Sequence, residues 1–374
     1  MLFPYKYVPH QMEKMQTFID FIFYEVWCKA PNEEYGIHLY EAETDLLKVM
    51  EELYKRDMAG KLMDKSADNF FYVAINEIYN EFKTLTDHEI DQYKSCFTAN
   101  NMVEELCSCV TAQRPITYVD LYPAREALNK KINNFFKQLY SSGFFDLKFV
   151  REALDSRLSD YYLSFVRENN NCTCPFCGLQ PLDSEYDPSR EAFDHYLPKS
   201  KYPFNSVNLK NLAPSCNKCN SGNKMDKDPL HDKQGNRRKA FYPFSEKQSD
   251  IAIKVVIKEK NWSTLTPENL SIDIQSVEFQ DETETWKELF RIEQRYAAKC
   301  CNTNGGSYWL NRVINENQNY SLSMQEMLAA ELKSASASPW IDANFLKKAF
   351  LKGCDSAGLF AIKEEVLETK NQKP

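Results

Sequence analysis

The chain has 374 residues, of which 43% are hydrophobic and 13% aromatic, and its formal net charge is -8. This length predicts two or three domains with ample cores, and the composition excludes an intrinsically disordered protein. The 12 cysteines are few for a disulfide scaffold of this size, so we expect metal ligands and free thiols in a reducing, cytoplasmic environment.

Residues 1–170 carry a helical pattern and are the first predicted domain, helical and suited to regulation or partner binding. No secretory signal opens the chain, and the most apolar stretch, residues 18–27, is too short to span a bilayer, so we expect no membrane association. Three sets of apolar residues recur at helical spacing, namely Leu46, Val49, Met50 and Leu53; Leu128, Ile132, Phe135, Phe136 and Leu139; and Val150, Leu154, Leu158, Tyr161, Tyr162 and Phe165. We expect the last set to form one helix that starts near Asp146.

Two Cys-x-x-Cys pairs lie in the next segment, Cys174 with Cys177 and Cys216 with Cys219. Each pair places two thiolates on one side of a tight turn, and four thiolates make a closed tetrahedral site for Zn²⁺. Such a site stabilises a fold and leaves no open position for chemistry. Cys172 is a fifth candidate ligand with a poorer spacing, and the alternative interpretation is four unrelated buried cysteines.

An Asp-His pair, Asp194 and His195, lies between the two cysteine pairs in a short apolar run that ends at Pro198. Neighbouring residues on a strand face opposite sides, so one side chain suits a metal ion and the other a water molecule. Asn220 follows the last cysteine, and Lys224 comes one helical turn later. Carboxylate and amide oxygens suit a magnesium-type ion, and a neutral histidine can take a proton from water. This set of groups can hydrolyse a phosphodiester.

On these residues the segment 171–245 resembles the HNH, or ββα-metal, endonuclease superfamily in its zinc-knuckle form. The resemblance implies that His195 is the general base, and that Asp194 and Asn220 hold a catalytic Mg²⁺ or Mn²⁺. It also implies that Asn211, in the run Asn-Leu-Ala-Pro, braces the loop that orients His195. Asn208 is a rival for the Asn211 position, and Asn220 stands where many members of the superfamily have histidine.

The charge of this segment differs from that of the whole chain. Residues 172–245 contain eleven Lys and Arg against eight Asp and Glu, a net charge of +3 in a chain of -8. A basic region of this kind favours phosphate contact, and we predict Lys224, Arg237, Arg238 and Lys239 as nucleic-acid-binding residues. For the last three, the alternative is a solvated loop. No pattern promises base-specific contacts, so we expect little sequence specificity and, most simply, DNA as substrate.

Residues 246–374 form the third predicted region, with two strands followed by helices. Apolar residues alternate over 251–257 and 270–274, which is typical of paired strands. We expect helices from Asp281, with Glu284 completing a capping box, and over 323–333 and 344–352. The fold class expected for the whole chain is α+β and mostly helical. The stretch 284–296 also resembles the region after the motif in HNH nucleases of bacterial anti-phage defence loci, of Septu and retron type.

The resemblance therefore implies an effector nuclease of a prokaryotic defence system. We expect a protein partner such as an ATPase, or a homo-oligomer, because the acidic flanks suit protein contact or shielding more than nucleic-acid binding. Two alternatives stay open. One is a zinc-stabilised module that binds nucleic acid without cutting it, and the other is a site-specific restriction or mobile-element endonuclease.

Overall fold

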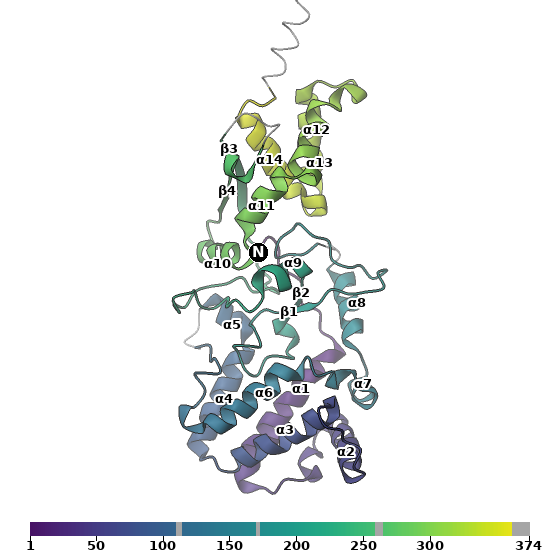
Figure 1. Ribbon diagram of the computed structural model, residues 1–374, viewed down its shortest axis with the longest axis vertical. Helices are drawn as coiled ribbons and strands as arrows, with labels where there is room; N and C mark the ends of the chain where they lie inside the picture. Colours follow the sequence, from purple (N-terminus) through teal and green to yellow (C-terminus); the bar gives the residue numbers. More distant parts are fainter. Residues whose placement is uncertain (110–113, 170–172, 259–264, 361–374) are drawn as a thin grey trace, which may run out of the picture. The chain divides into compact units, whose positions relative to one another are not determined.

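A computed structural model describes residues 1–109, 114–169, 173–258 and 265–360 (Figure 1). Helices dominate the described residues, and the strands form two antiparallel sheets of two strands each. This confirms the prediction of a mostly helical α+β protein. The chain divides into two compact units. The helical unit holds residues 5–170 and 183–246, and the C-terminal unit holds residues 1–4, 171–182 and 247–374.

The helical unit contains nine α-helices and the first sheet within its described residues. Their bounds are α1 (Lys14–Phe21), α2 (Thr44–Met58), α3 (Ala67–Phe82), α4 (Asp87–Asn101), α5 (Val103–Ser108), α6 (Glu126–Leu139), α7 (Lys148–Leu154), α8 (Leu158–Glu168), β1 (Phe193–His195), β2 (Leu212–Pro214) and α9 (Asn217–Cys219). Of the predicted nuclease module, residues 183–246 belong to this unit and residues 171–182 to the C-terminal unit.

The first two apolar stripes form helices as predicted, with all their members buried in α2 and α6. The third stripe is split, because Asp155 has a left-handed backbone with φ 53° and ends α7 before α8 begins. A right-handed helix cannot continue through such a residue, so the single predicted helix is two. The first of these, α7, begins after Leu147, and Asp146 lies in a preceding 3₁₀ turn.

An aromatic cluster at the centre of the helical unit positions the loop between the two short strands. The ring of Phe23 stacks on Phe97 of α4 at 4.0 Å, and Phe204 from the loop lies 5.1 Å from Phe97 and 5.2 Å from Phe136 of α6. All four side chains are buried. Full burial of such a ring stabilises the fold by about 1.5–3 kcal/mol, so the helices hold this loop firmly.

Strands β1 and β2 form a minimal antiparallel pair, in which Asp194 lies opposite Ala213 and His195 opposite Leu212. The chain then turns through Cys216 into α9, which continues as a π-helical turn over Asn220–Lys224. The order of elements is therefore strand, strand, helix.

The C-terminal unit contains the second sheet and the remaining helices. Their bounds are β3 (Ala252–Ile257), β4 (Leu270–Gln275), α10 (Gln280–Phe290), α11 (Ile292–Cys301), α12 (Tyr308–Ile314), α13 (Met324–Ala337) and α14 (Asn344–Ser356). The two strands pair antiparallel, with Val255 opposite Ile272, as the alternation predicts. Much of the connection between them, residues 259–264, lies outside the described residues. Helix α10 begins after Phe279 and has no side-chain cap, so the capping box predicted at Asp281 is wrong.

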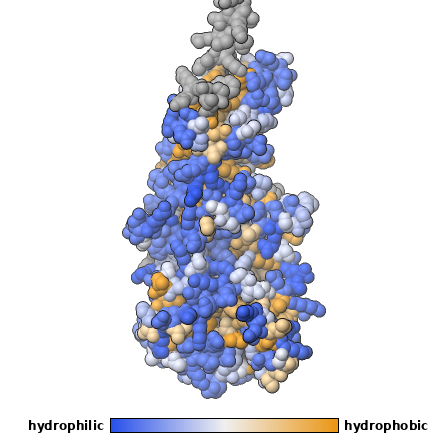
Figure 2. Space-filling model, viewed as in Figure 1, coloured by the Kyte–Doolittle hydropathy of each residue, from blue (hydrophilic) through white to orange (hydrophobic). Residues whose placement is uncertain are grey.

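The surface is mainly hydrophilic on the face drawn in Figure 2, where hydrophobic residues appear in separate groups. The most exposed large apolar side chains include Val119, Tyr186 and Val277, which come from distant parts of the sequence. Single exposed apolar residues of this kind are normal for a globular protein. Among the described residues, no helix has the length and apolar character needed to cross a membrane.

Candidate functional site

His195 ends β1, and its half-buried imidazole has one ring nitrogen engaged by the protein backbone. The Nε2 atom lies 2.9 Å from the carbonyl oxygen of Ser206. A carbonyl oxygen only accepts hydrogen bonds, so Nε2 carries the proton and Nδ1 carries the lone pair. Tyr140, at the end of α6, packs edge-on against the imidazole at 4.7 Å between ring centroids.

The protonation state of His195 follows from this setting. Burial and the positive charge of Lys199 lower the pKa of His195 to about 3. The imidazole is therefore neutral at physiological pH, and its lone pair lies on Nδ1. Lys199 itself is half-buried, donates a hydrogen bond to Ser141 over 3.1 Å, and lies 5.7 Å from the ring of Tyr140.

Asp194 is buried, and its carboxylate is paired with Lys224 from the π-helical turn. The Nζ nitrogen of Lys224 lies 3.1 Å from each carboxylate oxygen and donates to the His195 carbonyl over 2.8 Å. Lys224 has no exposed surface. The structure therefore places Lys224, predicted as a phosphate contact, inside the protein as the counter-charge of Asp194.

The fit of a divalent cation at Asp194 depends on this pair. Burial raises the pKa of Asp194, although Lys224 opposes the rise. Among the described residues, the Oδ2 atom of Asp194 accepts no hydrogen bond, even though it is buried. A carboxylate oxygen is the kind of ligand that Mg²⁺ and Mn²⁺ take. Here the ammonium group of Lys224 lies 3.1 Å from both oxygens, so a cation at Asp194 would share the carboxylate with Lys224 or displace it.

Asn211 is wholly buried and braces the chain just after β1. Its Oδ1 accepts from the Leu197 amide over 2.7 Å, and its Nδ2 donates to the Leu197 carbonyl over 3.0 Å. The same Nδ2 lies 3.2 Å from Oδ1 of Asn205. Asn211 therefore ties the two ends of the loop that carries Ser206.

The other two asparagines occupy different settings. Asn208 bonds to Asn101 at the end of α4 over 2.9 Å and accepts from the Lys210 amide, so it caps a 3₁₀ turn. It makes no bond to the Leu197 peptide. Asn220 is half-buried at the start of the π-helical turn that also carries Lys224. The turn thus joins Asn220 and the partner of Asp194 in one short element.

The four cysteines of the two Cys-x-x-Cys pairs form a cluster. The sulfur atoms of Cys174, Cys177, Cys216 and Cys219 all lie within 4.8 Å of one another, and all four residues are buried. Four thiolates around Zn²⁺ at 2.3 Å lie about 3.8 Å apart, so the cluster fits a closed tetrahedral zinc site. The cluster can hold a structural metal such as zinc, and Cys172 lies outside the described residues.

The backbone of the first cysteine pair is held inside the C-terminal unit. The indole nitrogen of Trp286 on α10 donates to the Phe176 carbonyl over 2.7 Å, and the hydroxyl of Tyr296 on α11 donates to the Cys177 carbonyl over 2.9 Å. Phe176 also stacks on Phe290 at 4.9 Å. The stretch 284–296 therefore contacts this turn.

The other three basic residues predicted as phosphate contacts follow the π-helical turn in the helical unit. Arg237 and Arg238 are half-buried, and Lys239 is exposed. Arg237 donates to the Leu230 carbonyl over 3.0 Å, and Arg238 donates to the Asp228 carbonyl over 2.6 Å. Both arginines therefore have backbone carbonyl partners within the helical unit.

A histidine that the sequence did not single out lies in the same segment. The Nδ1 atom of His231 is 3.1 Å from Asp228 Oδ2, and the hydroxyl of Tyr202 bonds to both carboxylate oxygens of Asp228 at 2.7 Å. Its bonds to these partners lower the pKa of Asp228. Sequence reasoning missed this cluster because Tyr202 lies far from the other two residues along the chain.

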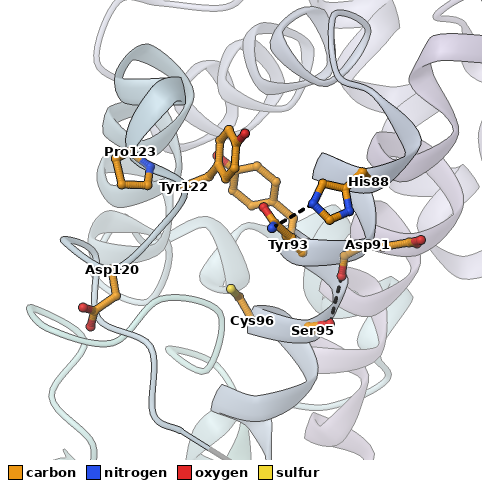
Figure 3. A pocket seen from close by; sticks show the side chains of 9 residues that line it. His88, Asp91, Tyr93, Ser95, Cys96, Asp120, Tyr122 and Pro123 are labelled. Atoms are coloured by element: carbon orange, nitrogen blue, oxygen red, sulfur yellow. Dashed lines mark hydrogen bonds between the residues drawn. The ribbon is translucent and has the colours of Figure 1, made fainter.

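A hollow lies beside α4, away from the predicted site residues. Figure 3 shows a hollow of about 520 Å³ lined by the α4 side chains of His88, Asp91 and Cys96 and by Asp120 and Tyr122 from the segment before α6. Gln92 bonds to His88 over 3.2 Å within it. None of the predicted site residues lines it, and burial raises the pKa of Cys96 to about 11, which makes its thiol unreactive.

Comparison with known proteins found no matching protein-family model, no matching curated protein and no matching solved structure. The functional interpretation of the site therefore rests on its residues and their geometry. Sequence reasoning also missed Lys199, Tyr140 and Ser206. Lys199 follows the Asp-His pair closely, but no local pattern identifies Tyr140 or the Ser206 carbonyl as neighbours of His195.

Proposed function

We propose that this chain is a metal-dependent endonuclease of the HNH type, which hydrolyses phosphodiester bonds in nucleic acid, most simply DNA, with little sequence preference. The observation that carries the proposal is the state of His195. The Nε2–H group donates a hydrogen bond to the Ser206 carbonyl, so the lone pair of the neutral ring lies on Nδ1. The neighbouring residue, Asp194, carries a buried carboxylate. This is the arrangement that a general base for water requires.

In this proposal His195 takes a proton from the attacking water at Nδ1, and the Ser206 carbonyl stabilises the imidazolium that forms. Asp194 and Asn220 are the residues that would hold the catalytic Mg²⁺ or Mn²⁺. When bound, such a cation polarises the scissile phosphate and stabilises the leaving oxygen. Asn211 keeps the loop after β1 in place, and Arg237, Arg238 and Lys239 supply positive charge for the phosphate backbone.

The cellular role proposed for this nuclease is that of an effector in prokaryotic anti-phage defence, in the cytoplasm. The support is the likeness of the stretch 284–296 to the nucleases of such loci, together with its contacts to the first cysteine pair. An unregulated nuclease with little specificity would damage its own cell. We therefore propose control by a protein partner, such as an ATPase, or by association of identical chains.

Cleavage of supercoiled plasmid by the purified protein tests the proposal. We expect cutting that requires Mg²⁺ or Mn²⁺ and that is lost in His195→Ala with an unchanged zinc content. His88→Ala is the matched control, because His88 is exposed on α4 and absent from the site. Cutting that persists in His195→Ala would remove the proposed base. If neither protein cuts, the assay is repeated with the products of neighbouring genes added, since a partner-controlled enzyme would be inactive alone.

A second candidate is a zinc-stabilised module that binds nucleic acid without cutting it. The ion pair between Asp194 and Lys224 favours this candidate, because an ammonium group stands where a cation would bind. It predicts retained binding in a gel-shift assay and no metal-dependent cutting under any condition. A site-specific restriction or mobile-element enzyme would give discrete fragments, whereas the proposed effector gives a smear.

A further inference from the structure

We propose that the C-terminal end of α4 orients His195, by holding the loop of residues 203–211 through Asn100 and Asn101. Neither α4 residue touches the imidazole, so both are positioning residues. The inference rests on the proposed role of His195 as general base. In this proposal α4 positions the general base as well as packing in the core.

The loop contains a backbone conformation that must be held in place. Phe204 has φ 79°, in the left-handed region that a bulky residue rarely adopts. Such a residue persists only where its surroundings fix it, and strained residues of this kind cluster at functional sites. Here the ring of Phe204 is buried among Phe97 of α4, Phe136 of α6 and Phe23.

Asn100 fixes the loop just before this residue. Its Nδ2 donates to the Pro203 carbonyl over 3.2 Å and to the Ile116 carbonyl over 2.7 Å, and its Oδ1 accepts from the Ile116 amide over 3.0 Å. The Asn100 backbone carbonyl accepts from Nδ2 of Asn205 over 2.9 Å. The last turn of α4 is thus bonded to the loop on both sides of Phe204.

A second set of bonds continues toward His195. Asn205 accepts from Asn211, which braces the Leu197 peptide after β1. Asn101 accepts from Asn208 over 2.9 Å, on the other side of Ser206. The Ser206 carbonyl, which fixes the Nε2 proton of His195, therefore lies between two residues that α4 holds directly.

Burial and chemistry both argue that these bonds do more than fill space. Asn100, Asn205 and Asn211 have no exposed surface, and their amide groups all make directed bonds, which link α4, the loop and the Leu197 peptide. Apolar residues would fill the same volume without the cost of burying amides. Buried amide groups with directed bonds specify one conformation, and here that conformation aims the Ser206 carbonyl at His195.

The test is Asn100→Asp, which keeps the acceptor for the Ile116 amide but removes the donor for the Pro203 and Ile116 carbonyls. Asn129→Asp is the matched control, because Asn129 on α6 likewise accepts, from Tyr93, and donates to a backbone carbonyl, that of Tyr122. Two readouts are needed: kcat and KM for plasmid cleavage, and the tautomer of His195 from the ¹⁵N spectrum of histidine-labelled protein, assigned with His195→Gln.

We expect Asn100→Asp to lower kcat by about 10- to 100-fold at nearly constant KM, as a misplaced catalytic group does. We also expect its His195 to lose the pure Nε2–H tautomer, while Asn129→Asp behaves as wild type in both respects. A folded Asn100→Asp protein with wild-type kcat and tautomer would overturn the proposal. If that variant fails to fold, Asn208→Ala removes the bond to Asn101 at the edge of the loop, and the same two readouts apply to it.

The tautomer measurement separates this inference from the proposed function. If the wild type cuts nothing even with the products of neighbouring genes added, the nuclease proposal fails, whereas a tautomer change in Asn100→Asp still supports the positioning of His195. If the wild type cuts and its tautomer is unaffected by loss of the Asn100 donor, only the positioning inference fails.

Discussion

Lys224 and Asp194 form an ion pair in which the Nζ nitrogen lies 3.1 Å from both carboxylate oxygens, and neither residue has appreciable exposed surface. The two residues are 30 positions apart in the sequence. Their pairing joins β1 to the π-helical turn after the second cysteine pair. It also sets a condition for any cation at Asp194, which must share the carboxylate with an ammonium group or displace it.

Replacement of Lys224 by methionine should destabilise the protein and make its stability depend on magnesium. Removal of one partner of a buried ion pair costs about 3–5 kcal/mol, because the other charge is left uncompensated. Added Mg²⁺ should recover part of this loss by binding Asp194. Urea unfolding of Lys224→Met with and without Mg²⁺ measures both effects, with Lys218→Met as control because Lys218 is exposed on α9. An equal loss under both conditions would argue against a cation site at Asp194.

Because of His195, the free energy of unfolding should decrease as the pH falls below neutrality. The folded pKa of His195 is about 3, and an unfolded histidine titrates near 6.5, so the unfolded chain binds more protons between these values. The free energy of unfolding therefore has its full value above about pH 6.5. It falls as the pH drops below 6.5, by at most about 1.4 kcal/mol per pH unit. Urea unfolding of the wild type and of His195→Gln at several pH values measures this effect, as the difference between the two free energies of unfolding. A slope that is the same in both proteins would contradict the lowered pKa.

The pH dependence of cleavage should also reflect the lowered pKa of His195. Because the ring stays neutral down to a pKa of about 3, we expect no loss of activity on the acid side near pH 6.5. The rate of plasmid nicking between pH 5 and 8, at saturating metal, checks this point. A fall in rate centred near 6.5 would mean that the base has an ordinary histidine pKa.

Loss of one cysteine ligand should remove zinc and loosen the turn that α10 and α11 hold. We expect Cys177→Ser to lose bound zinc and several kcal/mol of stability, since structural zinc contributes directly to folding. Metal analysis and thermal unfolding measure these changes, and quenching of Trp286 fluorescence reports the turn, because its indole bonds to the Phe176 carbonyl. Cys301→Ser on α11 is the control. Unchanged zinc content in Cys177→Ser would exclude the four-cysteine site.

Lys239 should contribute to nucleic-acid affinity through charge alone. It is exposed, so we expect Lys239→Gln to weaken binding similarly for all DNA sequences and to reduce the salt slope of log K by about 1. Gel-shift titrations at several salt concentrations give this slope. Lys333→Gln, at an exposed position of α13, is the control and should leave the slope unchanged. A wild-type slope in Lys239→Gln would place the phosphate contacts elsewhere.

Local sequence patterns were sufficient for the elements and for the cysteine cluster. The stripes of α2 and α6 and the alternation of β3 and β4 predicted helices and strands, because side-chain periodicity follows directly from backbone geometry. The Cys-x-x-Cys spacing predicted a metal site for a similar reason, since each pair is a local turn. The break between α7 and α8 escaped prediction, because no glycine or proline marks the left-handed residue Asp155.

What the sequence alone determined is thus the set of reactive groups: four thiols, an Asp-His pair and the asparagines around them. The tertiary structure decided which groups meet. It paired Lys224 with Asp194, whereas the sequence predicted Lys224 as a phosphate contact, and it placed the Ser206 carbonyl beside His195. It also bonded Asn100 to Pro203, 103 residues away. Such contacts depend on how helices and loops pack around a shared core, and packing between distant segments leaves no local pattern in the sequence.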